Sequence, residues 1–215
     1  MERGLLIVFE GLDGCGKSTQ LDLLYGVLCE RFLEHERAVI RTKEPTDGPV
    51  GRRIREMARG SVRVTPEQEL QWFIEDRREH TREVLEPGLA RGAIVLSDRN
   101  WLSNVAYQGA RGLEVAEILR ANRSEFPDPD LVLIFDIAAA VGLARVRARG
   151  GVAEPAFEEL EFLTRVEKIY GSIDLPFVKR IDASPSVTEI HQAVLEVVAE
   201  VVVDKFGGPG FTSAR

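Results

Sequence analysis

The 215-residue sequence has little of several features that mark particular classes of protein. It contains only two cysteines, Cys15 and Cys29, and no apolar run that approaches the roughly 20 residues of a membrane-spanning helix. A helix through both cysteines would separate them by roughly 20 Å, so they cannot form a disulfide with each other. With a charged N-terminus that lacks a cleavage-site pattern, these features predict a cytoplasmic protein with no membrane segment.

Basic side chains are also fewer than acidic ones. The chain has 35 acidic and 28 basic side chains, a formal net charge of −7. Proteins that grip duplex nucleic acid neutralise its phosphates with lysine and arginine, so this balance argues against a nucleic-acid partner. The three histidines (His35, His80 and His191) lack metal-ligand spacing and are expected at the surface or at edges of the fold.

The strongest local motif is a glycine-rich stretch, GLDGCGKS, from Gly11 to Ser18. It follows the apolar run 5–9 and precedes a helical pattern, and its spacing is typical of a phosphate-binding P-loop. Backbone N–H groups and the helix N-terminus favour a polyanion there, while Lys17 can reach the β- and γ-phosphates and Ser18 can ligate Mg²⁺. The alternative is an ordinary turn before a helix, but the strand and helix on either side favour the phosphate site.

Apolar runs of strand length alternate with helical patterns along the chain. Strands are expected at 5–9, 38–40, 93–96, 131–135 and 177–181. Helices are expected at 17–33, 50–59, 66–85, 102–107, 114–124, 139–149, 156–172 and 186–203. The alternation predicts an α/β fold, a five-stranded parallel sheet with helices on both faces, in one domain over 1–205. Residues 206–215 are expected to form a disordered tail.

Polar side chains follow three of the predicted strands. Glu10 and Asp13 come after the first strand, Glu44 after the second, and Asp98 with Arg99 after the third. Because ligands collect beyond the carboxyl ends of parallel strands, these side chains are expected to lie at one site.

A P-loop alone leaves the reaction open among GTPases, ATP-driven motors, kinases and sulfotransferases. The Asn-Lys-x-Asp sequence of GTPases is absent, and there is no extended motor domain. Arg99 and the arginines at 145, 147 and 149 would suit phosphoryl transfer between two anions, because one guanidinium group can donate two hydrogen bonds to the oxygens of a phosphate. The spacing of those three also fits a solvated helix face, so both interpretations stay open.

Several motifs, taken in order, resemble those of the thymidylate kinase family, whose members move the γ-phosphoryl group of ATP onto dTMP. The similarity extends from Ile7 to about residue 200. The matching motifs are Phe9-Glu10-Gly11 into the P-loop, Thr42-Lys43-Glu44-Pro45, Phe73 with Arg77, Asp98-Arg99, residues 103–109 (SNVAYQG), Pro129-Asp130-Leu131 and Ile181-Asp182-Ala183. The resemblance implies the nucleoside monophosphate kinase type of P-loop fold, with a short lid.

The resemblance also implies a set of site residues. ATP would be bound by Gly11, Leu12, Asp13, Gly14, Cys15, Gly16, Lys17, Ser18, Thr19 and, beside the adenine, Ala183. The acceptor dTMP would be bound by Asp13, Glu44, Arg55, Phe73, Arg77, Arg99, Ser103, Asn104, Tyr107 and Gln108. Catalysis would fall to Lys17, Asp13, Arg99, Arg147 and Arg149, with Mg²⁺ near Ser18 and Asp98.

Five of these residues would recognise the thymidine part of dTMP. Phe73 would stack on the thymine ring, Arg77 would donate to a thymine carbonyl, and Tyr107 would lie along the sugar. Asn104 and Gln108 would complete the polar edge, which favours a thymine or uracil ring over cytosine. Without the resemblance, Phe73 and Tyr107 fit a packed core better than a base platform, and Arg77 fits an exposed ion pair better than a ligand contact.

The chain departs from the family pattern at the lid, expected at about 147–157. Gly14 stands where some members carry an arginine, which implies that the arginine comes from the lid instead. The Asp-Arg pair usual there is replaced by GVAEP at 151–155, so Arg147 and Arg149 are expected to supply the charge.

The resemblance implies a homodimer. Two alternative functions remain. One is a kinase for another pyrimidine nucleoside monophosphate, and the other is a non-catalytic nucleotide-binding protein with a decayed lid.

Overall fold

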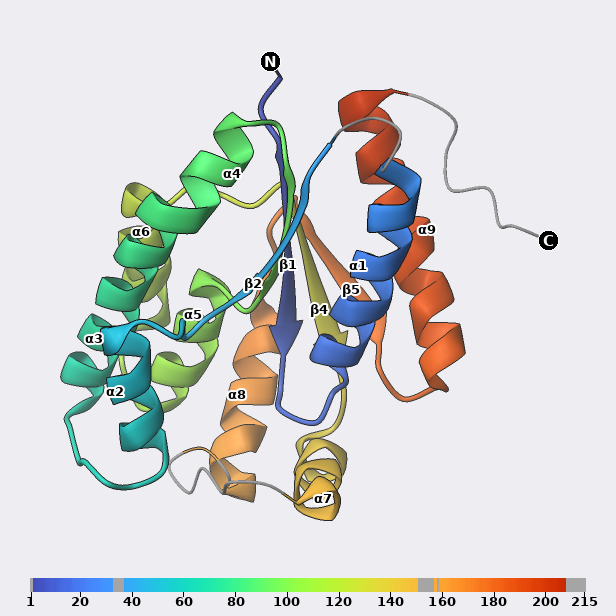
Figure 1. Cartoon of the computed structure of the whole chain (residues 1–215). Helices are drawn as coiled ribbons and strands as arrows, with labels where there is room; N and C mark the ends of the chain where they lie inside the picture. Colours follow the sequence, from blue (N-terminus) through green and yellow to red (C-terminus); the bar gives the residue numbers. More distant parts are fainter. Residues whose placement is uncertain (1, 33–36, 151–156, 158, 208–215) are drawn as a thin grey trace.

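The computed structural model describes residues 2–32, 37–150, 157 and 159–207. Within them, strands and helices alternate along the chain (Figure 1). The strands are β1 (Leu5–Gly11), β2 (Val39–Lys43), β3 (Ile94–Asp98), β4 (Leu131–Asp136) and β5 (Val178–Asp182). The helices are α1 (Lys17–Phe32), α2 (Pro49–Ala58), α3 (Pro66–His80), α4 (Glu86–Ala90), α5 (Trp101–Ala110), α6 (Val115–Glu125), α7 (Ala139–Arg149), α8 (Leu160–Ser172) and α9 (Val187–Phe206), with a π-helical turn η2 (Thr81–Leu85) between α3 and α4.

The five strands form one parallel sheet in the order β2-β3-β1-β4-β5. β1 lies at the centre, where Phe9 pairs with Asp98 of β3 on one side and with Leu133 of β4 on the other. Every residue of β1 is buried, because a central parallel strand is covered on both faces. The predicted α/β fold with a five-stranded parallel sheet is confirmed.

Helices cover both faces of the sheet (Figure 1). Leu5, Ile7 and Phe9 of β1 point into one core, which is closed by α1 and α9. Leu6 and Val8 point into the opposite core, which includes buried residues of α2, α5 and α8. Alternate side chains of one strand therefore enter different cores, and the P-loop that follows β1 lies between the two layers of helices.

The strands extend further toward their carboxyl ends than the apolar pattern predicts. β1 includes Glu10 and Gly11, β2 reaches Lys43, and β3 includes Ser97 and Asp98. Ladder hydrogen bonds join backbone groups, so a polar side chain does not end a strand. The polar residues predicted to follow the strands therefore lie at one edge of the sheet.

The helix expected to end near Leu85 instead continues past Pro87. The N–H of Glu86 donates to the carbonyl of Thr81, an i→i+5 contact that widens the helix for one turn. α4 then begins at Glu86, with Pro87 among its first residues. Proline is tolerated there because the first N–H groups of a helix have no acceptor within it.

Two predicted segments fall wholly or partly outside the described residues. Of the predicted lid and tail, residues 151–156 and 208–215 are not described, whereas α9 extends to Phe206 and so includes the first residue of the predicted tail. In the described ranges, no helix combines the length and the hydropathy needed to cross a bilayer. Cys15 and Cys29 are both free.

Candidate active site

A cavity of about 330 Å³ opens at the carboxyl edge of the sheet, between the P-loop, α2, α3 and α5. Most of the predicted site residues line it; the exceptions are Gly11, Leu12, Cys15, Arg77, Arg147 and Ala183. Five further residues also line it, namely Lys43, Pro45, Ile54, Ala58 and Phe157. Residues from the P-loop motif and from the predicted acceptor motifs thus share one cavity.

The P-loop is shaped by its glycines and by Lys17. Gly11, Gly14 and Gly16 have φ values of 134°, 81° and 96°, which favour glycine over residues with side chains. The Lys17 ammonium donates to the carbonyls of Gly11 (3.1 Å) and Leu12 (2.9 Å), and only 5% of its side chain is exposed. Lys17 therefore holds the loop from inside, with its charge beside the cavity.

Asp13 joins the P-loop to the opposite wall of the cavity. Its carboxylate accepts from Arg99 Nη2 at 2.6 Å and lies 3.7 Å from Lys17 Nζ. Burial acts to raise the pKa of Asp13, but the charges of Arg99 and Lys17 outweigh it and lower the pKa from 3.8 to about 2. Asp13 is therefore ionised throughout the neutral range.

Arg99 reaches Asp13 from an unusual backbone conformation at the end of β3. Its φ is 73°, in the left-handed region that residues with side chains rarely adopt. Its N–H donates to the carbonyl of Phe9, and its guanidinium donates to Ser103 Oγ (3.0 Å) and Tyr107 Oη (3.2 Å). These contacts hold its charge at the wall of the cavity, beside Asp13.

Ser18 and Asp98, the predicted metal ligands, are in direct contact. Ser18 Oγ donates to Asp98 Oδ2 at 2.7 Å, although 80 residues separate them in the sequence. Mg²⁺ prefers hard oxygen donors and commonly uses one or two protein oxygens together with substrate phosphates and water. The donor chemistry of this pair therefore fits Mg²⁺, and its role as the metal site stays a prediction.

α3 and α5 form the wall predicted to bind the pyrimidine. Phe73 is half-buried and lines the cavity, and its role as a ring platform stays a prediction. Asn104 Nδ2 donates to Gln108 Oε1 at 2.9 Å, and Gln108 Nε2 donates to Glu69 Oε1 at 2.8 Å. The two amides are almost wholly buried, so their orientation is set by the protein. Tyr107 is also buried, and this raises the pKa of its hydroxyl.

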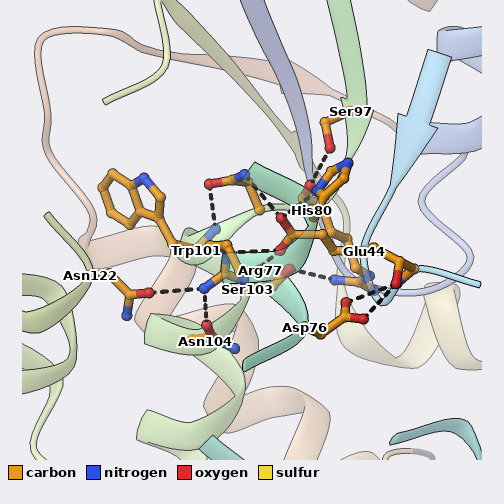
Figure 2. Close-up of polar contacts among 12 residues, drawn as sticks. Glu44, Asp76, Arg77, His80, Ser97, Trp101, Ser103, Asn104 and Asn122 are labelled. Atoms are coloured by element: carbon orange, nitrogen blue, oxygen red, sulfur yellow. Dashed lines mark hydrogen bonds and ion pairs between the residues drawn. The ribbon is translucent and has the colours of Figure 1, made fainter. Parts of the chain in front are cut away.

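Arg77 lies behind this wall and does not line the cavity. Figure 2 shows its guanidinium between Glu44, Asn104 and Asn122. Nε and Nη2 donate to Glu44 Oε2 at 2.9 and 2.6 Å, and Nη1 donates to the side-chain oxygens of Asn104 and Asn122. This placement differs from the expected contact of Arg77 with a thymine carbonyl, because the guanidinium hydrogen bonds are directed to protein acceptors.

Glu44 is the partner that holds Arg77 in the interior. Its other oxygen contacts His80 Nδ1 at 2.9 Å (Figure 2). The same oxygen accepts from Asn100 Nδ2 at 3.3 Å. Burial acts to raise the pKa of Glu44, but Arg77 and His80 outweigh it and lower the pKa overall. The expectation that His80 lies at the surface or an edge is wrong: 2% of it is exposed, and its other ring nitrogen contacts Thr42 Oγ1.

The lid arginines divide into one that reaches the cavity and others that do not. Arg149 lines the cavity, and its charge helps to lower the pKa of Asp13. Arg147 is exposed and does not line it. Arg145 Nη1 donates to the carbonyl of Ala183 at 3.2 Å, and Ala183 itself is buried outside the cavity.

Some residues that shape the site were not assigned roles from the sequence. Glu10 is fully buried and accepts from the N–H groups of Asn100 and Ser103 at the start of α5, and from Ser103 Oγ and Tyr170 Oη. Burial raises the pKa of Glu10. Phe157 packs against Tyr107 with ring centroids 5.7 Å apart. The sequence indicates a special role for Glu10, because an acidic residue directly follows the apolar run 5–9. No pattern in the sequence indicates that Phe157 packs on Tyr107.

Comparisons with known proteins identify the family to which the chain belongs. The family model described as thymidylate kinase matches residues 9–194. The chain is 39% identical to the thymidylate kinase of Desulfotalea psychrophila over 93% of its length and 96% of the relative, and 41% identical to that of Akkermansia muciniphila over 95% and 96%. A crystal structure of thymidylate kinase from Ehrlichia chaffeensis superposes with a TM-score of 0.73 at 27% identity, covering 91% of this chain and 98% of that one. The chain belongs to the thymidylate kinase family of nucleoside monophosphate kinases.

Proposed function

We propose that this chain transfers the γ-phosphoryl group of ATP to dTMP, giving ADP and dTDP, by direct in-line displacement. The observation that carries the proposal is the single cavity that P-loop and acceptor-motif residues line together, joined by the contact between Asp13 and Arg99. A phosphate monoester oxygen is already a nucleophile, so the protein has mainly to position two anions and to offset their charge.

On the donor side, backbone N–H groups of the P-loop and the N-terminus of α1 would bind the phosphates of ATP. Lys17 would lie beside the transferred group, because it borders the cavity and is held by the loop carbonyls. Ser18 and Asp98 would hold Mg²⁺, which supplies charge neutralisation on the phosphate oxygens when bound. Ala183 borders no part of the cavity, so its proposed place beside the adenine rests on the family resemblance alone.

On the acceptor side, Phe73 would stack on thymine and Arg99 would bind the monophosphate. Arg55 also lines the cavity, where it donates to the carbonyl of Pro45 at 3.0 Å and would offer further positive charge to dTMP. Arg77 would act through Asn104, whose amide it orients, since its own guanidinium lies behind the wall. The remaining N–H groups of the Asn104 and Gln108 amides would face the oxygens of the ring.

Among the lid arginines, Arg149 would supply the charge for the transition state, because it lines the cavity. Arginine side chains stabilise the transferring phosphoryl group through its equatorial oxygens. Arg147 has no direct part in this proposal because, unlike Arg149, it does not line the cavity.

Release of ADP in a coupled assay with ATP, Mg²⁺ and dTMP tests the proposed reaction. A panel of dTMP, dUMP, dCMP, UMP and thymidine tests the acceptor, with dTMP expected to give the highest kcat/KM. Lys17→Ala is expected to abolish turnover while the thermal unfolding transition stays cooperative. Tight ATP binding without dTMP-dependent ADP release would instead favour a non-catalytic nucleotide-binding protein.

We also propose a cytoplasmic homodimer, on the basis of family membership and the free cysteines. Light scattering coupled to size-exclusion chromatography tests the dimer, for which the expected mass is twice the 23.9 kDa of the chain. A monomer mass at micromolar concentration would contradict it.

A further inference from the structure

The backbone of α7 lies directly on the P-loop at two glycines. A Cβ atom at position 14 would lie 2.2 Å from the carbonyl oxygen of Gly142, and a Cβ at position 142 would lie 2.8 Å from the carbonyl oxygen of Asp13. Both distances are shorter than real Cβ atoms show, and both neighbours are backbone atoms that cannot rotate away. The approach is therefore possible only because both positions are glycine.

Other contacts fix α7 in this position. The N–H of Ala139, in its first turn, donates to Glu167 Oε2 of α8 at 2.8 Å. Leu143 is buried in the core, and Arg145 Nη1 donates to the carbonyl of Ala183. A methyl group added at Gly142 would therefore have to push α7 and the P-loop apart by several tenths of an ångström.

Arg149 lies on the same face of α7 as Gly142. The two are seven residues apart, which places them about two turns and roughly 10 Å apart along one side of the helix. Arg149 lines the cavity beside Asp13, whereas Arg147, on another side of the helix, does not. A change in the distance between α7 and the P-loop would therefore move the end of the helix that carries Arg149 relative to the cavity.

We propose that Gly142 is a positioning residue for phosphoryl transfer: its contact with the P-loop sets the distance of α7 from the donor phosphates and so places Arg149. The inference rests on the proposed phosphotransfer and on the part given there to Arg149. With α7 at its present distance, position 14 has no room for a side chain. The P-loop therefore cannot supply an arginine from position 14, and α7 has to supply it instead. A misplacement of about 1 Å can cost an enzyme about 100-fold in rate.

Gly142→Ala tests the inference, with Gly171→Ala as its matched control. Gly171 lies in α8, where an added Cβ would meet nothing within 4 Å, so both variants gain the same intrinsic helix propensity. We expect Gly142→Ala to lower kcat by about tenfold or more, while KM for dTMP and Kd for ATP change by less than about twofold. Gly171→Ala should keep the kcat of the parent chain.

Arg149→Ala and the double variant show whether Gly142 acts through Arg149. If it does, Gly142→Ala will slow the parent chain but will not slow Arg149→Ala further. The same fold-loss in both backgrounds, or a Gly142→Ala variant as fast as Gly171→Ala, would overturn the inference. If Arg149→Ala keeps full kcat, the inference fails while the proposed phosphotransfer stands; if the parent chain releases no ADP with dTMP, the proposed function itself fails.

Glu167→Ala supplies the test if thermal unfolding shows that Gly142→Ala is not folded at the assay temperature. This variant removes the acceptor at the first turn of α7 without crowding the P-loop. We expect a several-fold loss of kcat in the parent chain and none in the Arg149→Ala background. Equal losses in the two backgrounds, or no loss in either, would contradict the positioning role.

Discussion

Arg77→Met would remove one partner of the most buried ion pair described above. Only 1% of the Arg77 side chain and 4% of the Glu44 side chain are exposed, so water cannot replace the lost contacts. Breaking a buried pair by removing one partner costs about 3–5 kcal/mol, because the remaining charge stays buried. For a chain of this size each kcal/mol lowers Tm by about 2–4 °C, so we expect a fall of about 6–20 °C.

The double variant Arg77→Met with Glu44→Gln separates the pair from its surroundings. The glutamine carries no charge, and its side-chain oxygen can still accept from Asn100. We therefore expect the double variant to recover at least about 1 kcal/mol relative to Arg77→Met alone, which is visible as a higher Tm. A double variant destabilised by the sum of the two single losses would show that the charges act independently.

Arg78→Met is the matched control, since Arg78 is the next residue of α3 and pairs with Glu125 at the surface. Exposed pairs contribute about 0–1 kcal/mol, so its Tm should fall by no more than about 4 °C. Differential scanning calorimetry without nucleotide measures all the variants under one condition. The reasoning is refuted if Arg77→Met lowers Tm no more than Arg78→Met does.

Three further predictions concern metal binding, pH dependence and backbone packing. Asp98→Asn should raise the Mg²⁺ concentration needed for half-maximal rate about tenfold or more; an unchanged Mg²⁺ titration contradicts its place at the metal. Burial raises the pKa of Glu69 above its ordinary 4.5, so the folded state loses stability as pH rises from 4.5 through the folded pKa. At pH 8 the free energy of unfolding measured in urea should therefore be higher for Glu69→Gln than for the parent chain. The difference should become smaller as the pH falls toward 4.5; a difference that does not change with pH rules out titration of Glu69 as its cause. Gly51→Ala should lower Tm, because its Cβ would lie 1.9 Å from the carbonyl oxygen of Thr46. Gly26→Ala is the control: its Cβ would meet no atom within 4 Å, so its free energy of unfolding should rise by about 0.5–1 kcal/mol. Equal changes in Tm for the two variants would contradict the contact at Gly51.

The sheet and the donor loop could be predicted from the sequence because their signals are local. The buried strands are runs of adjacent apolar residues, and the P-loop is a single motif whose conformation its own glycines allow. Because ligands collect beyond the carboxyl ends of parallel strands, the strand order alone predicts that Asp13, Asp98 and Arg99 lie together, and all three line one cavity.

The interior of the acceptor wall could not be predicted, because its contacts join residues far apart in the chain. Arg77 is held by Asn122, 45 residues later, and His80 by Glu44, 36 residues earlier. On α3 alone, the neighbouring acids make Arg77 look like part of a solvated face, and only the position of α6 and β2 reveals the burial. Phe157 lies in a segment that matches no family motif, so nothing local pointed to its packing on Tyr107.

The left-handed backbone of Arg99 has a consequence for any attempt to stabilise this chain by design. Residues with side chains pay about 1–2 kcal/mol for that conformation, and glycine does not. Glycine at position 99 would avoid that backbone cost, but this gain would be offset by the loss of the Arg99 side-chain contacts, since only 16% of that side chain is exposed. The same change would remove the guanidinium that contacts Asp13, Ser103 and Tyr107, and would leave the two halves of the cavity unlinked. At this position the backbone conformation alone favours glycine, whereas the contacts of the side chain require arginine.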